Sequence, residues 1–183
     1  MPDGITPVPV VLVDVARPLG VYSGRADGSP TRMAISRQAA DVGLTFVHEA
    51  GHYIDHHVLG GAAGVASGRP LVDNWRNAAR ATAATQRLMN IVLNPGTRLV
   101  VAPDGTLVPR PDDLRYVIYL LQETEVFARS YTQYIAEKSG DATLLAELQM
   151  AQAMPYPEQW TIQDFAPISA EFDGLLAQQG ILL

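Results

Sequence analysis

Residues 48–52 read His-Glu-Ala-Gly-His, and this pentapeptide constrains the fold more than any other part of the chain. On an α-helix, His48 and His52 lie one turn apart and point the same way, so both imidazoles can reach one metal ion. Glu49 lies about 100° further round the helix, close enough to take a proton from a metal-bound water. The pattern therefore predicts a helix that carries a hydrolytic zinc site.

The residues around the pentapeptide predict a helix that buries one side. Asp41 fits an N-cap and the glycines at 60 and 61 fit a helix end. Between them, apolar residues recur at helical spacing: Leu44, Val47, Gly51, Ile54 and Val58. The metal-binding edge falls beside this stripe, so it can face a cleft while the stripe packs on a core. The alternative is a pair of surface histidines with a solvated glutamate.

Composition limits both the class of protein and the kind of metal site. The 183 residues, 48% apolar and 17% charged, predict a single globular domain over residues 1–183. The net charge of −6, with no basic stripe, argues against a nucleic-acid partner. The absence of cysteine means that histidines and carboxylates must hold any metal. No apolar run approaches about 18 residues and no signal peptide is visible, so we expect no membrane span. A cytoplasmic protein or one exported by a signal-independent route fits these features.

Strand patterns come first along the chain and helical patterns follow, which predicts an α+β fold with a small N-terminal mixed sheet. Strands are expected at 8–13, 20–24 and 32–36, and a hairpin at 97–108. Helices are expected at 41–59, 73–93 and 111–139, then after Asp141 and at 169–179, with a loop at 60–70.

A catalytic zinc usually has three protein ligands and an open position for water, so the two histidines need a third partner. The candidates are Asp55, His56, His57, Glu123 and Glu125. One straight helix cannot place three ligands tetrahedrally round one ion, so a second helix is expected to supply the third. Because they are two residues apart, Glu123 and Glu125 point to different sides of such a helix, and only one can face the histidines.

Two segments, Val47-His-Glu-Ala-Gly-His-Tyr-Ile-Asp55 and Glu123-Thr-Glu-Val-Phe-Ala-Arg129, resemble the gluzincin metallopeptidases. Within that group they are most similar to the family of the anthrax lethal factor catalytic domain and the Pro-Pro endopeptidases. The resemblance implies a zincin-like fold and a zinc-dependent endopeptidase. It also implies Glu125 as the third Zn²⁺ ligand beside His48 and His52, with Glu49 as the general base.

The chain departs from the family pattern in two places. The gap between the two segments is longer, and Ile118 occupies the position of the family's oxyanion-stabilising tyrosine. Tyr119 is our candidate for that role and Tyr116 is the alternative. Asp55 is expected either to orient a ligand imidazole or pair with Arg129, or to be an ordinary surface carboxylate.

The expected partner is a peptide in an extended conformation, bound along an edge strand by β-augmentation. Segment 32–36 is the candidate strand because it immediately precedes the motif helix. His56 and His57 are expected as solvated histidines at the helix end. A toxin-like effector protease or a mobile-element processing protease would use the same chemistry. A catalytically idle zincin that acts as a binding module would keep the zinc but not need Glu49.

Overall fold

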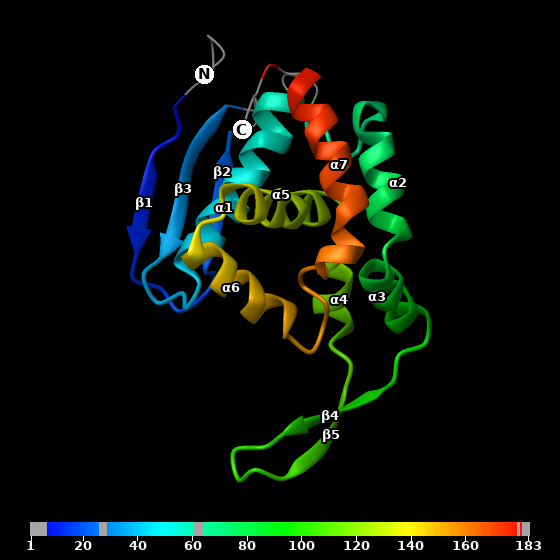
Figure 1. Ribbon diagram of the computed structural model, residues 1–183. Coiled ribbons are helices and arrows are strands. Elements are labelled where there is room, and N and C mark those ends of the chain that lie inside the picture. Colours follow the sequence, from blue (N-terminus) through cyan, green and yellow to red (C-terminus); the bar gives the residue numbers. More distant parts are fainter. Residues whose placement is uncertain (1–6, 26–28, 61–63, 179, 181–183) are drawn as a thin grey trace.

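The structure, a computed structural model, describes residues 7–25, 29–60, 64–178 and 180. Three strands come first and helices follow, with a hairpin in between, so the expected α+β class is confirmed (Figure 1). The strands are β1 (Val10–Val13), β2 (Gly20–Gly24), β3 (Pro30–Ser36), β4 (Thr97–Val101) and β5 (Leu107–Pro111). The α-helices are α1 (Val42–Tyr53), α2 (Asp73–Ala81), α3 (Ala83–Leu93), α4 (Leu114–Leu120), α5 (Glu123–Ser139), α6 (Ala142–Gln152) and α7 (Ile162–Gln178). A π-helix, η1 (Ile54–Gly60), and a 3₁₀-helix, η3 (Pro70–Val72), complete the described elements.

The N-terminal sheet has β3 at its centre, parallel to β1 and antiparallel to β2. Met33 of β3 lies between Val10 of β1 and Tyr22 of β2. The prediction that segment 32–36 is an edge strand is therefore wrong, because strands pair with it on both sides. The edge strand in contact with α1 is β2.

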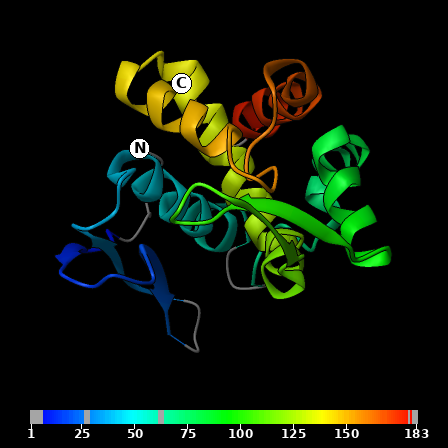
Figure 2. The ribbon, with the colours of Figure 1, turned by 90° about the horizontal axis from the view of Figure 1, so that it is seen from below.

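The helices α1 and α5 pack closely because a glycine of one faces an alanine of the other. A Cβ atom on Gly51 would lie 2.8 Å from Cα of Ala128 and 3.1 Å from its carbonyl oxygen. Leu44 and Val47, on the same stripe of α1, are also buried. Figure 2 shows the N-terminal sheet on one side of this helix pair and α2 and α3 on the other. The apolar stripe thus brings α1 against the helix that carries Glu125.

The helix around the pentapeptide starts and ends differently from the expectation. Asp41 occupies the N-cap position of α1 but makes no side-chain capping bond. Instead, Glu147 of α6 accepts a hydrogen bond from the backbone N–H of Leu44 at 2.6 Å. At its other end, α1 continues as the π-helix η1, so segment 41–59 is not one uniform α-helix.

Two segments expected to be continuous helices are each broken by an extended residue. Thr82, with ψ 148°, separates α2 from α3, so the predicted helix 73–93 is two helices. Gln122, with ψ 134°, likewise divides the predicted helix 111–139 into α4 and α5. Pro111 lies at the end of β5 and not in a first helical turn. The apolar residues keep their helical spacing on both sides of Thr82 and Gln122. The sequence pattern therefore does not reveal that the helices end there.

The largest cluster of buried side chains lies where α2, α5 and α7 meet. Trp75, Phe127 and Phe172 form its centre, with ring centroids 5.1–6.5 Å apart. The last helix begins at Ile162, earlier than the predicted start at residue 169, and its first turns help to close this core.

The β4–β5 hairpin projects from the end of the molecule at which α3 and α4 lie (Figure 1). Leu99, Val101 and Leu107 share one face of it and are 66%, 70% and 62% exposed. On the other face, the guanidinium carbon of Arg98 lies 4.2 Å from the centroid of the Tyr156 ring. This stacking holds the base of the hairpin against the rest of the protein.

Candidate metal centre

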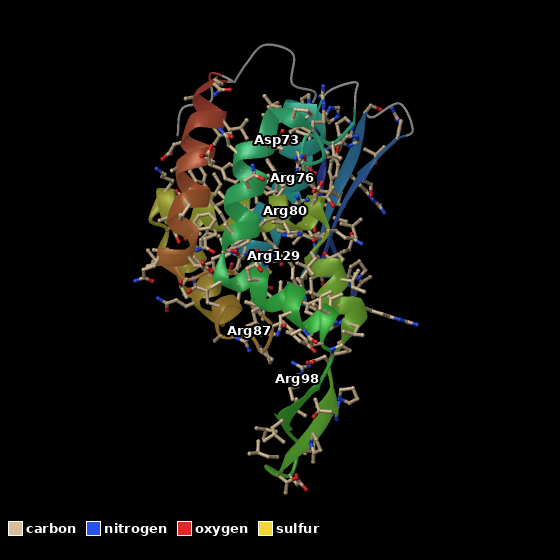
Figure 3. The ribbon with its side chains drawn as sticks, turned by 90° about the vertical axis from the view of Figure 1, so that its right-hand side faces the viewer. Asp73, Arg76, Arg80, Arg87, Arg98 and Arg129 are labelled. Atoms are coloured by element: carbon tan, nitrogen blue, oxygen red, sulfur yellow. The ribbon has the colours of Figure 1, made fainter. Side chains whose placement is uncertain are left out.

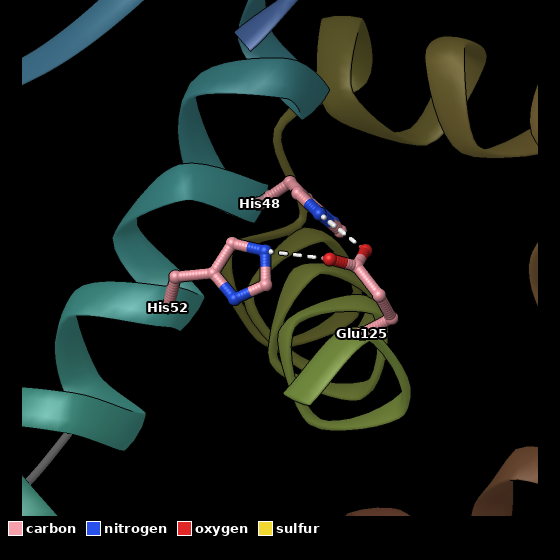
Figure 4. Close-up of side chains that lie close together, drawn as sticks. All are labelled: His48, His52 and Glu125. Carbon is pink, nitrogen blue, oxygen red and sulfur yellow. Dashed lines mark ion pairs between the residues drawn. The ribbon is translucent and has the colours of Figure 1, made fainter. Parts of the chain in front are cut away.

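His48 and His52 lie one turn apart on α1 and face Glu125, in the first turn of α5 (Figure 4). Nε2 of His48 lies 3.3 Å from Oε2 of Glu125, and Nε2 of His52 lies 3.3 Å from Oε1 of the same carboxylate. The candidate ligand atoms of all three residues lie within 4.8 Å of one another. The structure thus brings together the three residues that the sequence predicts as metal ligands.

The distances from the two histidines to Glu125 fit those in a tetrahedral zinc site. Zinc binds imidazole nitrogen and carboxylate oxygen at about 2.0–2.2 Å, which places neighbouring tetrahedral ligands about 3.3–3.5 Å apart. The two nitrogen–oxygen distances of 3.3 Å agree with this spacing. Oε2 of Glu125 is buried and makes no hydrogen bond of acceptable geometry, which is costly unless a cation satisfies it. Two imidazoles and one carboxylate are also the ligands of a known type of catalytic zinc site.

The charges of the three residues favour an ionised carboxylate at the centre. Burial raises the pKa of Glu125, but the neighbouring imidazoles of His48 and His52 outweigh it and hold that pKa well below the usual range. Burial lowers the pKa of His52, but the hydrogen bond with Glu125 and the surrounding carboxylates outweigh it and raise that pKa overall. Glu125 is therefore negatively charged at neutral pH, as a metal ligand must be.

Glu49 is held against the free edge of β2. Its Oε2 accepts a hydrogen bond from the backbone N–H of Tyr22 at 2.5 Å. A Cβ atom on Gly20 would lie only 2.4 Å from Oε1, so the absence of a side chain there makes room for the carboxylate. Burial raises the pKa of Glu49, while the charges of His48 and His52 oppose that shift. A raised carboxyl pKa suits a group that exchanges protons near neutral pH.

Gly20 and Tyr22 are site residues that the sequence did not reveal. Both lie in a short strand, and their contact with Glu49 joins positions that are far apart in the chain. Tyr22 binds Glu49 through its backbone N–H, which almost any residue could supply, so the sequence gives no sign of this role. A glycine at the start of a strand is the one local hint of a close approach.

Of the two candidate tyrosines, the structure places Tyr119 beside the metal centre. The Tyr119 phenol donates a hydrogen bond to Glu125, and burial together with this bond raises the pKa of the phenol. Tyr116 donates instead to Glu158, and its ring stacks on that of Tyr119 with centroids 6.1 Å apart. Ile118, at the position of the family's tyrosine, is 51% exposed. The break between α4 and α5 brings Tyr119 and Glu125 together.

Asp55 is buried, so the alternative of an ordinary surface carboxylate is wrong. Its Oδ1 accepts a hydrogen bond from the backbone N–H of Ser67 at 2.6 Å, and its carbonyl oxygen accepts one from Ala66 at 3.0 Å. Burial raises the pKa of Asp55, while the bonds from Ser67 and the charge of His52 lower it. Asp55 therefore ties the segment after η1 to the neighbourhood of a ligand imidazole.

The expected pairing of Arg129 with Asp55 is wrong. The Arg129 guanidinium donates to three backbone carbonyl oxygens: those of Leu120 at 2.8 Å, Pro157 at 3.1 Å and Glu158. Its carbon also lies 4.8 Å from the centroid of the Trp160 ring. Through these bonds, Arg129 of α5 holds the end of α4, where Tyr119 lies, against α5.

Glu123 lies apart from the metal centre, as the helical argument requires. Its Oε1 is 2.7 Å from Nη2 of Arg80 and 3.2 Å from Nε of Arg76, both on α2. His56 and His57 are also outside the three-residue cluster. Both are half-buried and so less solvated than expected, and the ring centroids of His56 and Tyr22 are 6.1 Å apart.

Open space lies on both sides of the cluster. One cavity has a volume of about 360 Å³ and extends toward Tyr22, Asp55 and His56. The other has about 240 Å³ and extends toward Leu44 and Ala151. Four residues line both cavities: Gly20, Glu49, Tyr119 and Glu125. An extended chain could therefore cross the centre with residues on either side.

Among the described residues, no helix is both long enough and apolar enough to cross a membrane. The chain matches no protein-family model, no curated protein and no solved structure. Its function is therefore inferred from the residues and geometry of the metal centre.

Proposed function

We propose that the protein is a zinc-dependent endopeptidase of the gluzincin type with a zincin-like fold. The observation that carries the proposal is the convergence of His48, His52 and Glu125 within 4.8 Å, with Glu49 lining the same two cavities as Glu125. A zinc ion in this site would keep one open position, lower the pKa of a bound water and polarise a peptide carbonyl.

Glu49 carries protons in the proposed reaction. Its carboxylate accepts a proton from the attacking water and then gives one to the leaving amine. The N–H of Tyr22 and the space left by Gly20 fix where this carboxylate lies. Tyr119, next to Glu125, donates its phenolic hydrogen bond to the oxyanion that forms at the scissile carbonyl.

The strand β2 replaces segment 32–36 as the proposed binding strand for an extended peptide. It is an edge strand in contact with α1, and Gly20 lines both cavities beside the metal centre. Space on both sides favours cleavage within a chain over removal of terminal residues. The proposed substrate is therefore an internal, extended segment of a peptide or protein.

An idle zincin that only binds a partner is the rival from another class. Such a protein would need the three ligands but no proton carrier. The way Glu49 is held beside the cluster, with both carboxylate oxygens against β2, favours the enzyme. Effector and processing proteases would share this site and differ in their substrates.

Digestion of a peptide library by the wild type and by Glu49→Gln tests the proposal. Glutamine keeps the shape but cannot accept the proton, so the variant should retain zinc and lose cleavage by about three orders of magnitude or more. Glu171→Gln, on α7 away from the centre, is the matched control and should cleave like the wild type. Retention of more than roughly a few per cent of cleavage by Glu49→Gln would exclude Glu49 as the base. Zinc binding without any cleavage by the wild type would favour the idle zincin.

A further inference from the structure

Arg76, on α2, binds two parts of the chain, and each of them is in contact with the metal centre or carries one of its residues. Its guanidinium donates to the carbonyl oxygen of Ser67 at 2.6 Å and 3.2 Å, and to that of Arg69 at 3.0 Å. Its Nε lies 3.2 Å from Oε1 of Glu123, and its Nη1 contacts the carboxylate of Asp73. Figure 3 shows Arg76 on α2 between Asp73 and Arg80.

The first part is the segment that turns back after η1. Ser67 is fully buried and donates its backbone N–H to Asp55, while Arg69 donates to the carbonyl oxygen of Gly60 at 2.9 Å. Asp55 is three residues past His52, where α1 continues as η1, and both residues line the same cavity. The carbonyl groups that Arg76 binds therefore belong to the segment that fixes Asp55 near a proposed ligand.

The second part is the start of α5. Glu123 is the first residue of that helix, and Glu125 lies in the same first turn. The Arg76 side chain is only 14% exposed, so its bond to Glu123 is shielded from water more than that of Arg80, which is 61% exposed. A shielded ion pair is screened less than an exposed one. Arg80 makes the shorter contact with Glu123, a hydrogen bond of 2.7 Å, but Arg76 is the less exposed partner and also binds the carbonyl groups of Ser67 and Arg69.

Only arginine can make this set of contacts. The guanidinium offers five N–H donors in a planar fork and here serves two carbonyls and two carboxylates. A lysine keeps the charge but has one nitrogen at the end of a flexible stem, so it cannot bridge all four acceptors in the same geometry.

We propose that Arg76 is a positioning residue for the metal centre. Arg76 holds the segment that binds Asp55 at a fixed distance from the first turn of α5, and this places Glu125 opposite the two histidines. The inference rests on the proposed zinc site. It assigns Arg76 no contact with substrate or metal.

Zinc affinity, measured by competition with a chromogenic chelator, tests this role. Residues that orient metal ligands through a hydrogen bond typically change metal affinity by 10–100-fold, and Arg76 acts one contact further out. Arg76→Lys should therefore weaken zinc binding about tenfold. Glu123→Gln, which keeps the bonds from Arg76 to the 67–69 segment, should weaken it in the same direction. Arg80→Gln is the matched control and should leave zinc affinity within about twofold of the wild type.

Thermal unfolding with and without zinc separates positioning from general stability. If Arg76 positions the ligands, Arg76→Lys reduces the rise in melting temperature that saturating zinc produces. If it only supports the fold, the metal-free melting temperature falls while zinc affinity and the zinc-induced rise stay at wild-type values, which overturns the inference. Unchanged zinc affinity in Glu123→Gln overturns it as well, even if Arg76→Lys fails to fold. A wild type that binds no zinc overturns the proposed function itself, which is a different outcome.

Discussion

At the scale of single residues, two glutamates only two positions apart have different surroundings. Glu125 faces the histidines of α1, while Glu123 faces the arginines of α2. The 3.6-residue period of the helix requires such a division, and it was predicted from the sequence on that basis. The partners of Glu123 were not predicted, because Arg76 and Arg80 belong to a helix with no local link to it.

Glu125→Ala should abolish stoichiometric zinc binding, because two histidines and water make a weak site. Metal analysis after dialysis should find about one zinc per chain in the wild type and much less in the variant and in His48→Ala. Glu123→Ala should still load close to one zinc when zinc is in excess. Equal zinc content in Glu125→Ala and the wild type, with a loss in Glu123→Ala, would move the ligand to Glu123.

Tyr119→Phe should slow peptide cleavage without removing zinc. Loss of one oxyanion donor typically lowers kcat by about 100–1000-fold, and KM should change little. Tyr116→Phe loses a bond to Glu158 and none to Glu125, so its kcat should stay within about threefold of the wild type. A larger effect from Tyr116 than from Tyr119 would reverse the assignment.

At the scale of elements, the contact between α1 and α5 determines whether the ligands can meet. Gly51 lets the backbones approach, and the histidines lie on the adjacent edge of α1. Neither helix carries all three ligands, so the distance between their axes is part of the metal site. Substitutions in this contact should therefore affect zinc as well as stability.

Gly51→Ala should destabilise the fold, although alanine favours helices. The new Cβ would meet backbone atoms of Ala128, and overpacking of this kind typically costs about 1–3 kcal/mol, more than the roughly 1 kcal/mol gained in helix propensity. Gly174→Ala in α7 is the control, because its Cβ would meet nothing within 4 Å and should stabilise by about 0.5–1 kcal/mol. Denaturant unfolding would give both values, and a stabilised Gly51→Ala would show that α1 and α5 are not so tightly packed.

The sequence predicted regular elements well and their interruptions poorly. The helix around His48 and the strand at 20–24 follow from periodicity and turn residues. The extended residues Thr82 and Gln122 lie within good helical patterns, and tertiary contacts decide their conformation. The site followed the same division. Spacing predicted the two histidines and the family resemblance pointed to Glu125, while the contacts of Glu49 with β2 depend on long-range packing.

At the scale of the whole molecule, the β4–β5 hairpin is separate from the metal centre and from the main core (Figure 1). Replacing residues 99–109 by Asn-Gly, between the cross-strand partners Arg98 and Arg110, would remove its exposed apolar face and keep its base. The shortened protein should bind zinc with wild-type affinity and be more soluble, because the removed residues belong to none of the buried clusters and their exposed apolar face is lost. A large loss of zinc affinity would show that the hairpin supports α4 and Tyr119.

The proposed ligands come from two distant parts of the chain, residues 48 and 52 in one and residue 125 in the other, and the chain has no cysteine. A bound ion would close a long loop between α1 and α5, as a disulfide would. For a covalent link over a loop of this length, the entropy lost by the unfolded chain corresponds to about 4 kcal/mol. Unlike a disulfide, this link forms and breaks with the concentration of free zinc. The stability of the folded protein would then rise and fall with zinc supply.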